Sequence, residues 1–354
     1  MQKTLLITWW LWYIWSHGVI EFVKAGYEIV IIDNLSNSKL SVLDNIQKII
    51  NYKPIFYQID LLDKDWLENI FEKHKFDGVV HFAGLKAVGE SCENVWLYHT
   101  NNIVWSINLF ETMEKYSVRK IIFSSSATVY KVKDKIDSWL KEIDPTWDTT
   151  NPYGTTKFAI EQLLKDYANH KSWQVVNLRY FNPIWAHESW FLWEDPNGIP
   201  NNLLPYIMKV AVWELSEVWV FGNDYKTIDW TGVRDYIDVV DLVVWHLKAW
   251  ELVERWMEQQ TRAYKQKNIE TKPGLCGFFE SFNLWVWKWV SVLEMIDIAS
   301  DVVWNKIPYT IKPRRDWDLD IVYSDPSKAN EVLNWKAQSS IRQSIENSWK
   351  FYNK

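Results

Sequence analysis

A tyrosine and a lysine stand four positions apart in the segment Tyr153-Gly-Thr-Thr-Lys157. Residues four apart share one face of a helix, so the ammonium of Lys157 can lie beside the Tyr153 phenol and favour its phenolate. Such a phenolate is a usable base near neutral pH. The same spacing also occurs by chance on solvated helix faces, where the two side chains are only a surface pair.

A serine-rich strand end upstream makes the catalytic interpretation stronger. The run Phe123-Ser-Ser-Ser-Ala-Thr128 places Ser126 where a strand is expected to stop. Its hydroxyl can hydrogen-bond the same reacting oxygen as Tyr153 and steer the proton. Together the two segments indicate proton transfer to and from a substrate hydroxyl.

A second site is indicated at Asp33-Asn34, at the end of the second predicted strand. An acid at this place in a dinucleotide-binding unit pairs with the ribose 2′-hydroxyl and disfavours a 2′-phosphate. The pattern therefore favours NAD over NADP. An acid at a strand end is as often only a turn former.

The elements that must position these residues alternate short β-rich runs with longer amphipathic stretches. This pattern predicts a doubly wound α/β fold, a Rossmann-type parallel sheet over residues 1–181, followed by a smaller substrate-binding lobe over 182–354. A polar stretch near 254–277 is expected to be an insertion. The predicted strands are Thr4–Thr8, Glu28–Asp33, Pro54–Gln58, Gly78–Phe82, Lys120–Ser124 and Gln174–Tyr180, and the predicted helices are Ser16–Ala25, Asp65–Lys73, Val104–Lys115, Thr155–Asn169, Leu203–Leu215 and Val239–Glu254.

Composition excludes several classes of partner. The 354 residues carry a net charge of −6 without a basic cluster, so neither nucleic acid nor an anionic membrane is expected as a partner. No apolar stretch reaches the ~18 residues that would span a bilayer. The two cysteines, Cys92 and Cys276, and the lack of a leader point to a reducing cytoplasm. The seven histidines are scattered, and no metal site is expected.

One feature of the composition is abnormal. The chain has 11 glycines, whereas average usage of about 7% would give about 25, and it has 26 tryptophans. The first predicted strand runs into Thr8-Trp-Trp-Leu-Trp-Tyr-Ile-Trp-Ser-His17, where a dinucleotide-binding turn needs glycine. Tryptophan supplies neither the positive φ nor the close backbone approach that glycine allows there.

In a series of ordered motifs the chain resembles the UDP-glucose 4-epimerases, which are extended short-chain dehydrogenases/reductases. The resemblance spans nearly the whole chain outside the stretch near 254–277. It is carried by His81–Ser91, Phe123–Tyr130, Pro152–Gly154, Leu178–Pro183, Glu194–Leu203, Phe221–Tyr225, Thr231–Ile237 and Pro313–Arg315.

The resemblance implies a role for each matching position. Ser126, Tyr153 and Lys157 match the catalytic trio. Positions that line NAD are matched by Trp9, Trp12, Tyr13, Ile14, Trp15, Asp33, Asn34, Asp60, Phe82, Ala83, Lys86, Asn101, Tyr153, Lys157 and Tyr180. Positions that hold the nucleotide sugar are matched by Lys86, Ser126, Asn182, Asn202, Phe221, Arg234, Arg315 and Asp318. Arginine forks suit a diphosphate, and asparagine amides suit uracil and sugar hydroxyls. Each single Arg or Asn is otherwise an ordinary surface residue.

The chain departs from the family at many tryptophans. Those standing where the family has glycine are Trp9, Trp10, Trp12, Trp15, Trp105, Trp147, Trp185, Trp190, Trp193, Trp213, Trp230, Trp245, Trp285, Trp287, Trp289, Trp304 and Trp317. Read literally, an indole at Trp12 or Trp15 fills the space of the cofactor pyrophosphate. We hypothesise that the source organism reads the codon UGA as glycine, and that the written tryptophans come from a table that reads it as tryptophan. Trp173, Trp335 and Trp349 are expected to be genuine.

The expected activity is the interconversion of UDP-glucose and UDP-galactose through a 4-keto sugar with tightly bound NAD, in a homodimer. Val322 falls where a small residue would leave room for an N-acetyl group, which extends the expectation to UDP-N-acetylhexosamines. A related 4,6-dehydratase needs an Asp-Glu pair after the catalytic hydroxyl, and this chain has Ala127-Thr128 there. The alternatives are another NAD-dependent nucleotide-sugar epimerase or dehydratase, or an inactive binding protein if the tryptophans are literal.

Overall fold

The structure is a computed structural model that describes residues 2–8, 13–36, 38–131, 139–180, 182–184, 189, 191–192, 200, 202–266, 277–286, 289–315 and 318–353. Its centre is a seven-stranded sheet in the order β10-β6-β5-β4-β1-β2-β3, in which every neighbouring pair is parallel. The strands are β1 (Thr4–Thr8), β2 (Glu28–Asp33), β3 (Ile55–Gln58), β4 (Gly78–His81), β5 (Lys120–Ser124), β6 (Gln174–Arg179) and β10 (Phe278–Asn283).

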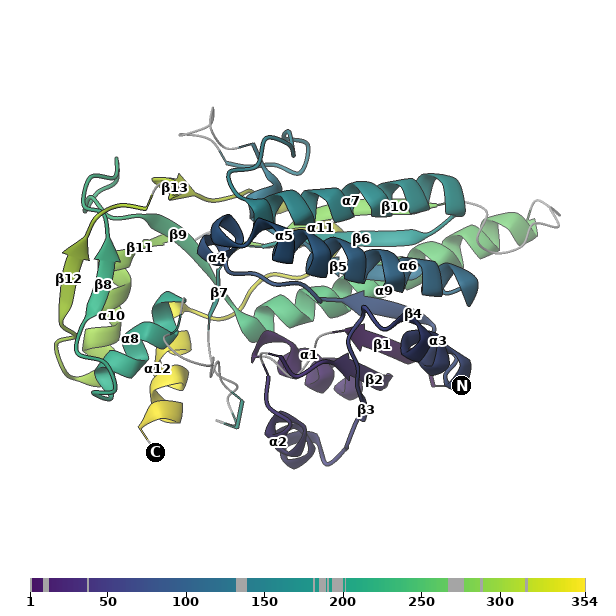
Figure 1. Ribbon diagram of the computed structural model, residues 1–354, viewed down its shortest axis with the longest axis horizontal. Helices are drawn as coiled ribbons and strands as arrows, with labels where there is room; N and C mark the ends of the chain where they lie inside the picture. Colours follow the sequence, from purple (N-terminus) through teal and green to yellow (C-terminus); the bar gives the residue numbers. More distant parts are fainter. Residues whose placement is uncertain are drawn as a thin grey trace.

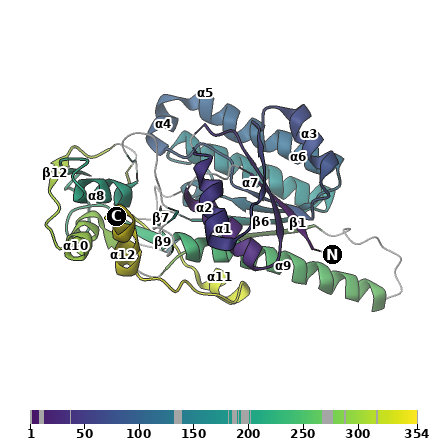
Figure 2. The same ribbon diagram turned by 90° about the horizontal axis from the view of Figure 1, so that it is seen from below.

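Two helical layers cover this sheet, as the alternation of side chains along β1 requires. Leu5 and Ile7 belong to one apolar cluster and Leu6 to the other, and all three are fully buried. The first layer holds α1 (Tyr13–Lys24), α2 (Ser41–Ile50) and α9 (Val239–Gln266). The second holds α3 (Lys64–Lys73), α6 (Trp105–Lys115) and α7 (Pro152–Lys171). Figures 1 and 2 show the two layers on opposite faces of the sheet.

Short helices connect β4 to α6 and β5 to α7. Between β4 and α6 lie α4 (Val88–Glu93), α5 (Val95–Tyr98) and the π-helix η1 (His99–Val104). After β5 comes one 3-10 turn, η2 (Ala127–Val129). These connections follow the carboxyl ends of the strands, where open α/β sheets bind ligands.

A smaller lobe lies beside the carboxyl edge of the sheet, at the left of Figure 1. Its four-stranded sheet has the path β11-β9-β13, with β7 also paired to β9. A second small sheet pairs β8 with β12. The elements are β7 (Asn182–Ile184), α8 (Leu203–Ala211), β8 (Val218–Phe221), β9 (Val233–Asp238), β11 (Trp289–Ser291), α10 (Val292–Val303), β12 (Tyr309–Lys312), β13 (Ile321–Val322) and α12 (Ile341–Tyr352). Helix α11 (Ser327–Val332) lies instead against β10 of the large sheet.

The structure differs from the sequence expectation in the second half of the chain. The seventh strand of the large sheet, β10, comes from beyond residue 181 and pairs with β6 in register from Phe278↔Gln174. The stretch 254–277, expected to be a polar insertion, is helical as far as Gln266 because α9 continues through it. Glu254 on this helix accepts hydrogen bonds from Lys3 and Tyr27 of the first domain. Residues 267–276 lie outside the described residues.

Tryptophans at expected glycine positions lie in different structural surroundings. Trp213, Trp230 and Trp304 have positive φ values of 64°, 64° and 55° and are exposed. This left-handed backbone favours glycine and is strained for a bulky side chain. Trp105 and Trp245 are instead packed in the core. The positive-φ group supports the recoding hypothesis.

Candidate active site

The catalytic candidates meet at the carboxyl edge of the large sheet. Strand β5 ends at Ser124, and Ser126 caps the 3-10 turn η2 by accepting a hydrogen bond from the Thr128 N–H. Helix α7 begins next to this turn, with Asn151 as its N-cap and Pro152 in its first turn. An added Cβ at Gly154 would lie 2.5 Å from the Thr128 carbonyl oxygen. Glycine at this position therefore lets Tyr153 approach the serine-bearing turn.

A hydrogen bond joins the hydroxyl groups of Ser126 and Tyr153. The Ser126 oxygen also accepts hydrogen bonds from the Thr128 N–H at 3.2 Å and the Thr128 hydroxyl at 3.0 Å. With two acceptor positions used, the Ser126 proton is left to point at its reacting partner. Burial raises the pKa of Tyr153 to about 12, and the hydrogen bond with Ser126 works in the opposite direction.

Lys157 lies one turn after Tyr153 on α7 and is buried. Its Nζ donates to the Ser124 carbonyl at 2.8 Å and lies 5.9 Å from the centroid of the Tyr153 ring. Burial lowers the pKa of Lys157 to about 7, while the charge of Glu161 raises it. The structure thus brings the three predicted residues together, and the lowering of the Tyr153 pKa by Lys157 stays a prediction.

The polar residues predicted to hold the cofactor adenosine follow β2 and β3. Asp33 is buried, and its Oδ1 accepts from the Leu35 N–H at 2.7 Å and the Ser38 hydroxyl at 3.0 Å. Asn34 donates to Asp60 at 2.8 Å, which joins the two strand ends. These groups sit at the end of the sheet edge where an adenosine ribose would lie.

The remaining NAD candidates line the ends of β4, β6 and the π-helix. The backbone N–H groups of Phe82 and Ala83 each donate to the Thr8 hydroxyl at 3.3 Å, which ties β4 to β1. Tyr180 is buried and bonds to the hydroxyl of Ser124. Lys86 and Asn101 are partly buried on the segments that follow β4.

These residues fit a dinucleotide, because the strand order reverses between β1 and β4 at the edge where they gather. A Cβ added at Gly84 would come within 3.2 Å of Asn102 and 3.5 Å of the Lys157 Nζ. Backbone without a side chain therefore borders the lysine. Trp9 and Trp12 lie outside the described residues. Helix α1 begins with Tyr13, Ile14 and Trp15, of which the structure describes only the backbone.

The predicted sugar-nucleotide residues form a charged cluster in the smaller lobe. Asp318 accepts from Arg315 at 2.7 Å, from Arg234 at 3.5 Å and from Tyr225 at 3.2 Å. The guanidinium of Arg315 lies 4.7 Å from the centroid of the Phe221 ring. One carboxylate thus holds two arginines together, and paired guanidinium groups suit a diphosphate.

Two asparagines complete the predicted set. Asn182 on β7 donates to the Asp235 carbonyl at 3.4 Å, and Asn202 occupies the N-cap position of α8 without capping it through its side chain. Strand β13 joins the cluster to the catalytic trio. Val322 pairs with Arg234 in the small sheet and packs in an apolar cluster with Ala127, the residue after Ser126.

Two residues that touch this site were missed by the sequence reasoning. Thr128 bonds to Ser126 with both its N–H and its hydroxyl, and a Ser-x-Thr turn at a strand end is the signal that could have shown it. Glu161 lies four residues after Lys157, so the same helical spacing that linked Tyr153 to Lys157 extends to a buried carboxylate.

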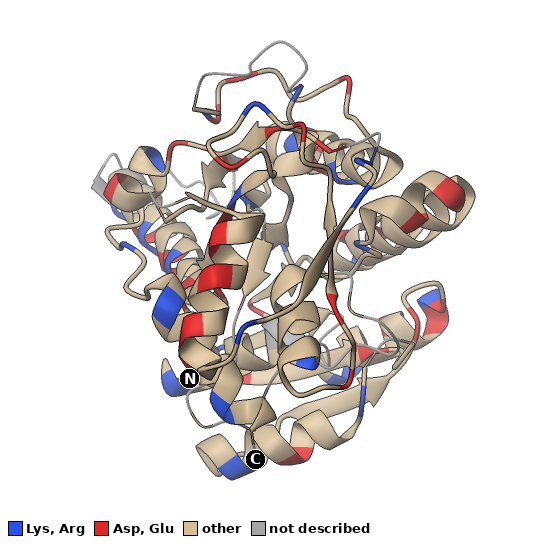
Figure 3. Ribbon diagram, turned by 90° about the vertical axis from the view of Figure 1, so that its left-hand side faces the viewer, with Lys and Arg blue, Asp and Glu red and all other residues tan. Residues whose placement is uncertain are grey.

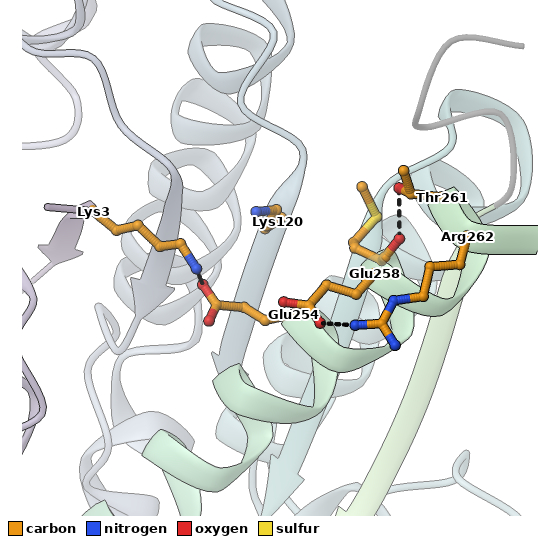
Figure 4. Close-up of a pocket in the computed structure, with 7 residues that line it drawn as sticks. Lys3, Lys120, Glu254, Glu258, Thr261 and Arg262 are labelled. Atoms are coloured by element: carbon orange, nitrogen blue, oxygen red, sulfur yellow. Dashed lines mark hydrogen bonds and ion pairs between the residues drawn. The ribbon is translucent and has the colours of Figure 1, made fainter. Parts of the chain in front are cut away.

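In Figure 3 basic and acidic positions are interspersed along the ribbons. A hollow of about 330 Å³ lies at the opposite, amino end of the strands, between Lys3, Lys120 and the Glu254–Arg262 part of α9 (Figure 4). Within the described ranges, no group of three or more His, Cys, Asp or Glu side chains is placed to hold a metal ion. Among the helices described, none has the length and apolarity to cross a membrane.

Comparison with known proteins points to one kind of enzyme. The family described as GDP-mannose 4,6 dehydratase matches residues 6–348. A UDP-glucose 4-epimerase of Bacillus subtilis (strain 168) is 43% identical over 348 residues, which are 98% of this chain and 96% of that protein.

Solved structures give the same result. A UDP-glucose 4-epimerase of Bifidobacterium longum in complex with NAD+ and UDP superimposes with a TM-score of 0.89 at 41% identity, covering 99% of this chain and 98% of that one. A UDP-glucose-4-epimerase of Stenotrophomonas maltophila, with bound NAD and formylated UDP-arabinopyranose, gives 0.88 at 36% identity with the same coverage.

Proposed function

The chain belongs to the UDP-glucose 4-epimerase family of extended short-chain dehydrogenases/reductases, and from this premise we propose that it interconverts UDP-glucose and UDP-galactose through a 4-keto sugar. The observation that carries the proposal is the meeting of Ser126, Tyr153 and Lys157 at the sheet edge that suits NAD. The chemistry that NAD supplies when bound is a reversible two-electron oxidation at C4 of the hexose.

The residues of the chain handle the proton and the orientation. Tyr153, as phenolate, accepts the proton of the sugar O4 and gives it back after the sugar has turned over. Ser126 accepts two hydrogen bonds from Thr128, so its own hydroxyl proton is available to bridge the Tyr153 oxygen and the sugar O4. Lys157 favours the phenolate by its charge. Arg234 and Arg315 hold the diphosphate, so that the hexose can expose either face.

We favour an epimerase over a dehydratase, although the matching family is described as GDP-mannose 4,6 dehydratase. Elimination of water needs an acid and a base after the catalytic hydroxyl, whereas this chain has Ala127 and Thr128. Thr128 is already bonded to Ser126, and Ala127 is buried. Neither side chain supplies a carboxyl group.

We also propose that the active protein carries glycine at the tryptophans that replace family glycines, including Trp9, Trp12 and Trp15. The positive φ values at Trp213 and Trp230 support this. A gene with glycine codons at all these positions and a gene with tryptophan codons test both proposals together. We expect the glycine protein alone to purify with NAD absorbance and fluorescence and to convert UDP-galactose to UDP-glucose.

A Tyr153→Phe variant of the glycine protein is the matched control. It should keep its NAD and lose activity by about 10² to 10⁴-fold, the usual contribution of a general base. A glycine protein that binds no NAD and leaves both sugars unchanged would contradict the epimerase. A tryptophan protein with full activity would contradict the recoding and leave the epimerase standing, and native peptides carrying tryptophan at Trp9 would do the same.

Two finer points are proposed beside the reaction. A homodimer formed through the outer helices is supported by the exposed Val95, Leu97 and Val104 on α5 and η1. The cytoplasm is the proposed location, and the exposed thiol of Cys92, which forms no disulfide with a described residue, is compatible with it.

A further inference from the structure

Glu161 is a buried carboxylate that the proposed proton transfer does not use. It is 1% exposed and lies on α7 four residues after Lys157, so the two side chains share one helix face. A carboxylate is rarely placed so deep without a paired charge. The structure supplies one from the neighbouring strand.

Arg179, the last residue of β6, is the charge that pairs with Glu161. Its Nε and Nη2 atoms donate to the two carboxylate oxygens at 2.9 and 2.6 Å. The other guanidinium nitrogen, Nη1, donates to the Tyr130 hydroxyl at 2.9 Å and to the Glu142 carbonyl at 3.4 Å. This two-point clamp fixes the carboxylate in position and orientation.

The same carboxylate holds the strand end that carries the catalytic serine. The Ser125 hydroxyl donates to the Glu161 Oε1 at 2.5 Å. Ser125 stands between Ser124, whose carbonyl accepts from Lys157, and Ser126 itself. Glu161 therefore holds, through the Ser125 side chain, the segment that carries Ser126 and accepts the hydrogen bond of Lys157.

We propose that Glu161 is a positioning residue of the active site, whose carboxylate keeps the Lys157 ammonium charged and anchors the turn that presents Ser126. The inference rests on the proposed function, since it assigns Glu161 a task in the same proton transfer. Arg179 belongs to the same arrangement because its two hydrogen bonds fix the position of the Glu161 carboxylate.

The groups facing Lys157 show why a negative charge is needed. On α7 they are Tyr153 and Glu161, and on β5 the ring of Phe123 and the Ser124 carbonyl. His81 on β4 is neutral, because burial and then the charge of Lys157 lower its pKa to about 3. Burial alone pushes Lys157 toward the neutral amine, and Glu161 is the described carboxylate whose charge opposes it.

The groups around Glu161 do not cancel this effect. Arg179 neutralises part of its charge through the clamp, and the Tyr130 phenol beyond it has a pKa raised by burial, so it stays uncharged. Burial also raises the pKa of Glu142, although the charge of Arg179 works in the opposite direction, and the Glu142 backbone carbonyl accepts a hydrogen bond from Arg179. The electrostatic interaction of Glu161 with Lys157 along the helix is therefore the one to test.

The decisive experiment titrates Lys157 directly in the NAD-bound protein. Lysine labelled with ¹³C at Cε gives an NMR signal whose midpoint reports the ammonium, and a Lys157→Met sample assigns that signal. In Glu161→Gln we expect the midpoint to fall by about one pH unit or more. The basic limb of the kcat/KM profile should move down by the same amount, with about tenfold lower activity at pH 8 and above.

Matched variants separate positioning from a purely structural role. Tyr130→Phe removes a hydrogen bond on the far side of Arg179 and should lower thermal stability while leaving the Lys157 midpoint unchanged. Glu161→Asp keeps the charge and should restore most of the midpoint. If Glu161→Gln does not fold because Arg179 is left unpaired, the double variant Glu161→Gln with Arg179→Met removes both buried charges and is titrated instead.

The outcomes distinguish this inference from the proposed function. An active wild type with the same lysine midpoint in Glu161→Gln, or in the double variant, overturns the role of Glu161 and leaves the epimerase intact. A midpoint that moves in a protein without epimerase activity supports the electrostatic role and overturns the proposed function.

Discussion

At the scale of single residues, Lys157 is needed for the proposed activity but lowers the stability of the fold, because its ammonium is buried. Its pKa is lowered from 10.5 to about 7 by burial, so between these values the unfolded chain binds a proton that the native protein does not. The free energy of unfolding therefore rises with pH across this window. The cost of burying the ammonium is fully present below pH 7.

Replacing Lys157 with Met should abolish activity and stabilise the fold. We expect the free energy of unfolding to increase by on the order of 1 to 3 kcal/mol at pH 6.5, and by less at pH 9.5. The lost hydrogen bond to the Ser124 carbonyl offsets part of the gain. Urea unfolding at the two pH values measures this, and an equal change at both would show that titration of Lys157 is not the cause.

Val322 is predicted to set substrate breadth. It is buried in β13 and packs with Ala127 beside the catalytic serine, so its size limits the space there. A Val322→Tyr variant should keep activity on UDP-glucose and lose at least about tenfold on UDP-N-acetylglucosamine, since a hexose pocket discriminates by fit. Coupled assays measure the activity on both sugars. An unchanged ratio of the two activities in the variant would show that Val322 does not set substrate breadth.

How far the site can be predicted differs from residue to residue. Tyr153 and Lys157 follow from a spacing within one helix, and Ser126 from a strand end, so local pattern was enough. The clamp of Arg179 on Glu161 joins a strand to a helix across the fold, and no local spacing encodes it. The raised pKa of Tyr153 could not be predicted from the sequence either, because its cause is burial, and burial depends on all the residues packed around the ring.

At the scale of elements, helix α10 ends in a way that tests the recoding. Trp304 is its C-cap in the left-handed conformation, and its side chain is 93% exposed. Glycine is the residue favoured at such an end. Trp304→Gly should therefore raise the free energy of unfolding by about 1 kcal/mol, and Trp213→Gly and Trp230→Gly should do the same at their positive-φ turns.

Trp173 provides the control for these substitutions. It is fully buried between α6 and α7, and its indole N–H donates to Glu114 at 2.8 Å. Trp173→Gly should lower the free energy of unfolding by about 3 to 5 kcal/mol, as large-to-small core changes do. Thermal scans of the four variants compare them directly. A loss of stability at Trp304 as large as that at Trp173 would contradict the recoding hypothesis.

Some elements, like some site residues, can be predicted from local sequence patterns, whereas others cannot. The first six strands are apolar runs bounded by turn residues, and five of the six predicted starts agree with the structure. Strand β10, with the sequence Phe-Phe-Glu-Ser-Phe-Asn, mixes aromatic and polar residues and follows a charged stretch, so its pattern does not identify it as a strand of the large sheet. The last turns of α9 look like a linker for the same reason, although Glu254 ties them to Lys3.

At the scale of the whole molecule, the proposed homodimer leads to a surface test. Leu97 on α5 and Val104 on η1 are aliphatic and are 41% and 38% exposed. A Leu97→Asp, Val104→Asp variant should elute as a monomer in size exclusion with light scattering. Ile228→Asp, at a 95% exposed site in the other lobe, should remain dimeric. A monomeric wild type would remove the proposal.

The late arrival of β10 has a consequence for how the protein is made. A nascent chain that has emerged only as far as β6 carries six of the seven strands of the large sheet, with the outer edge of β6 unprotected. Such an open edge invites pairing with other chains. A chain that ends before residue 283 would lack all or part of β10, so we expect such fragments to aggregate more readily than the full-length chain.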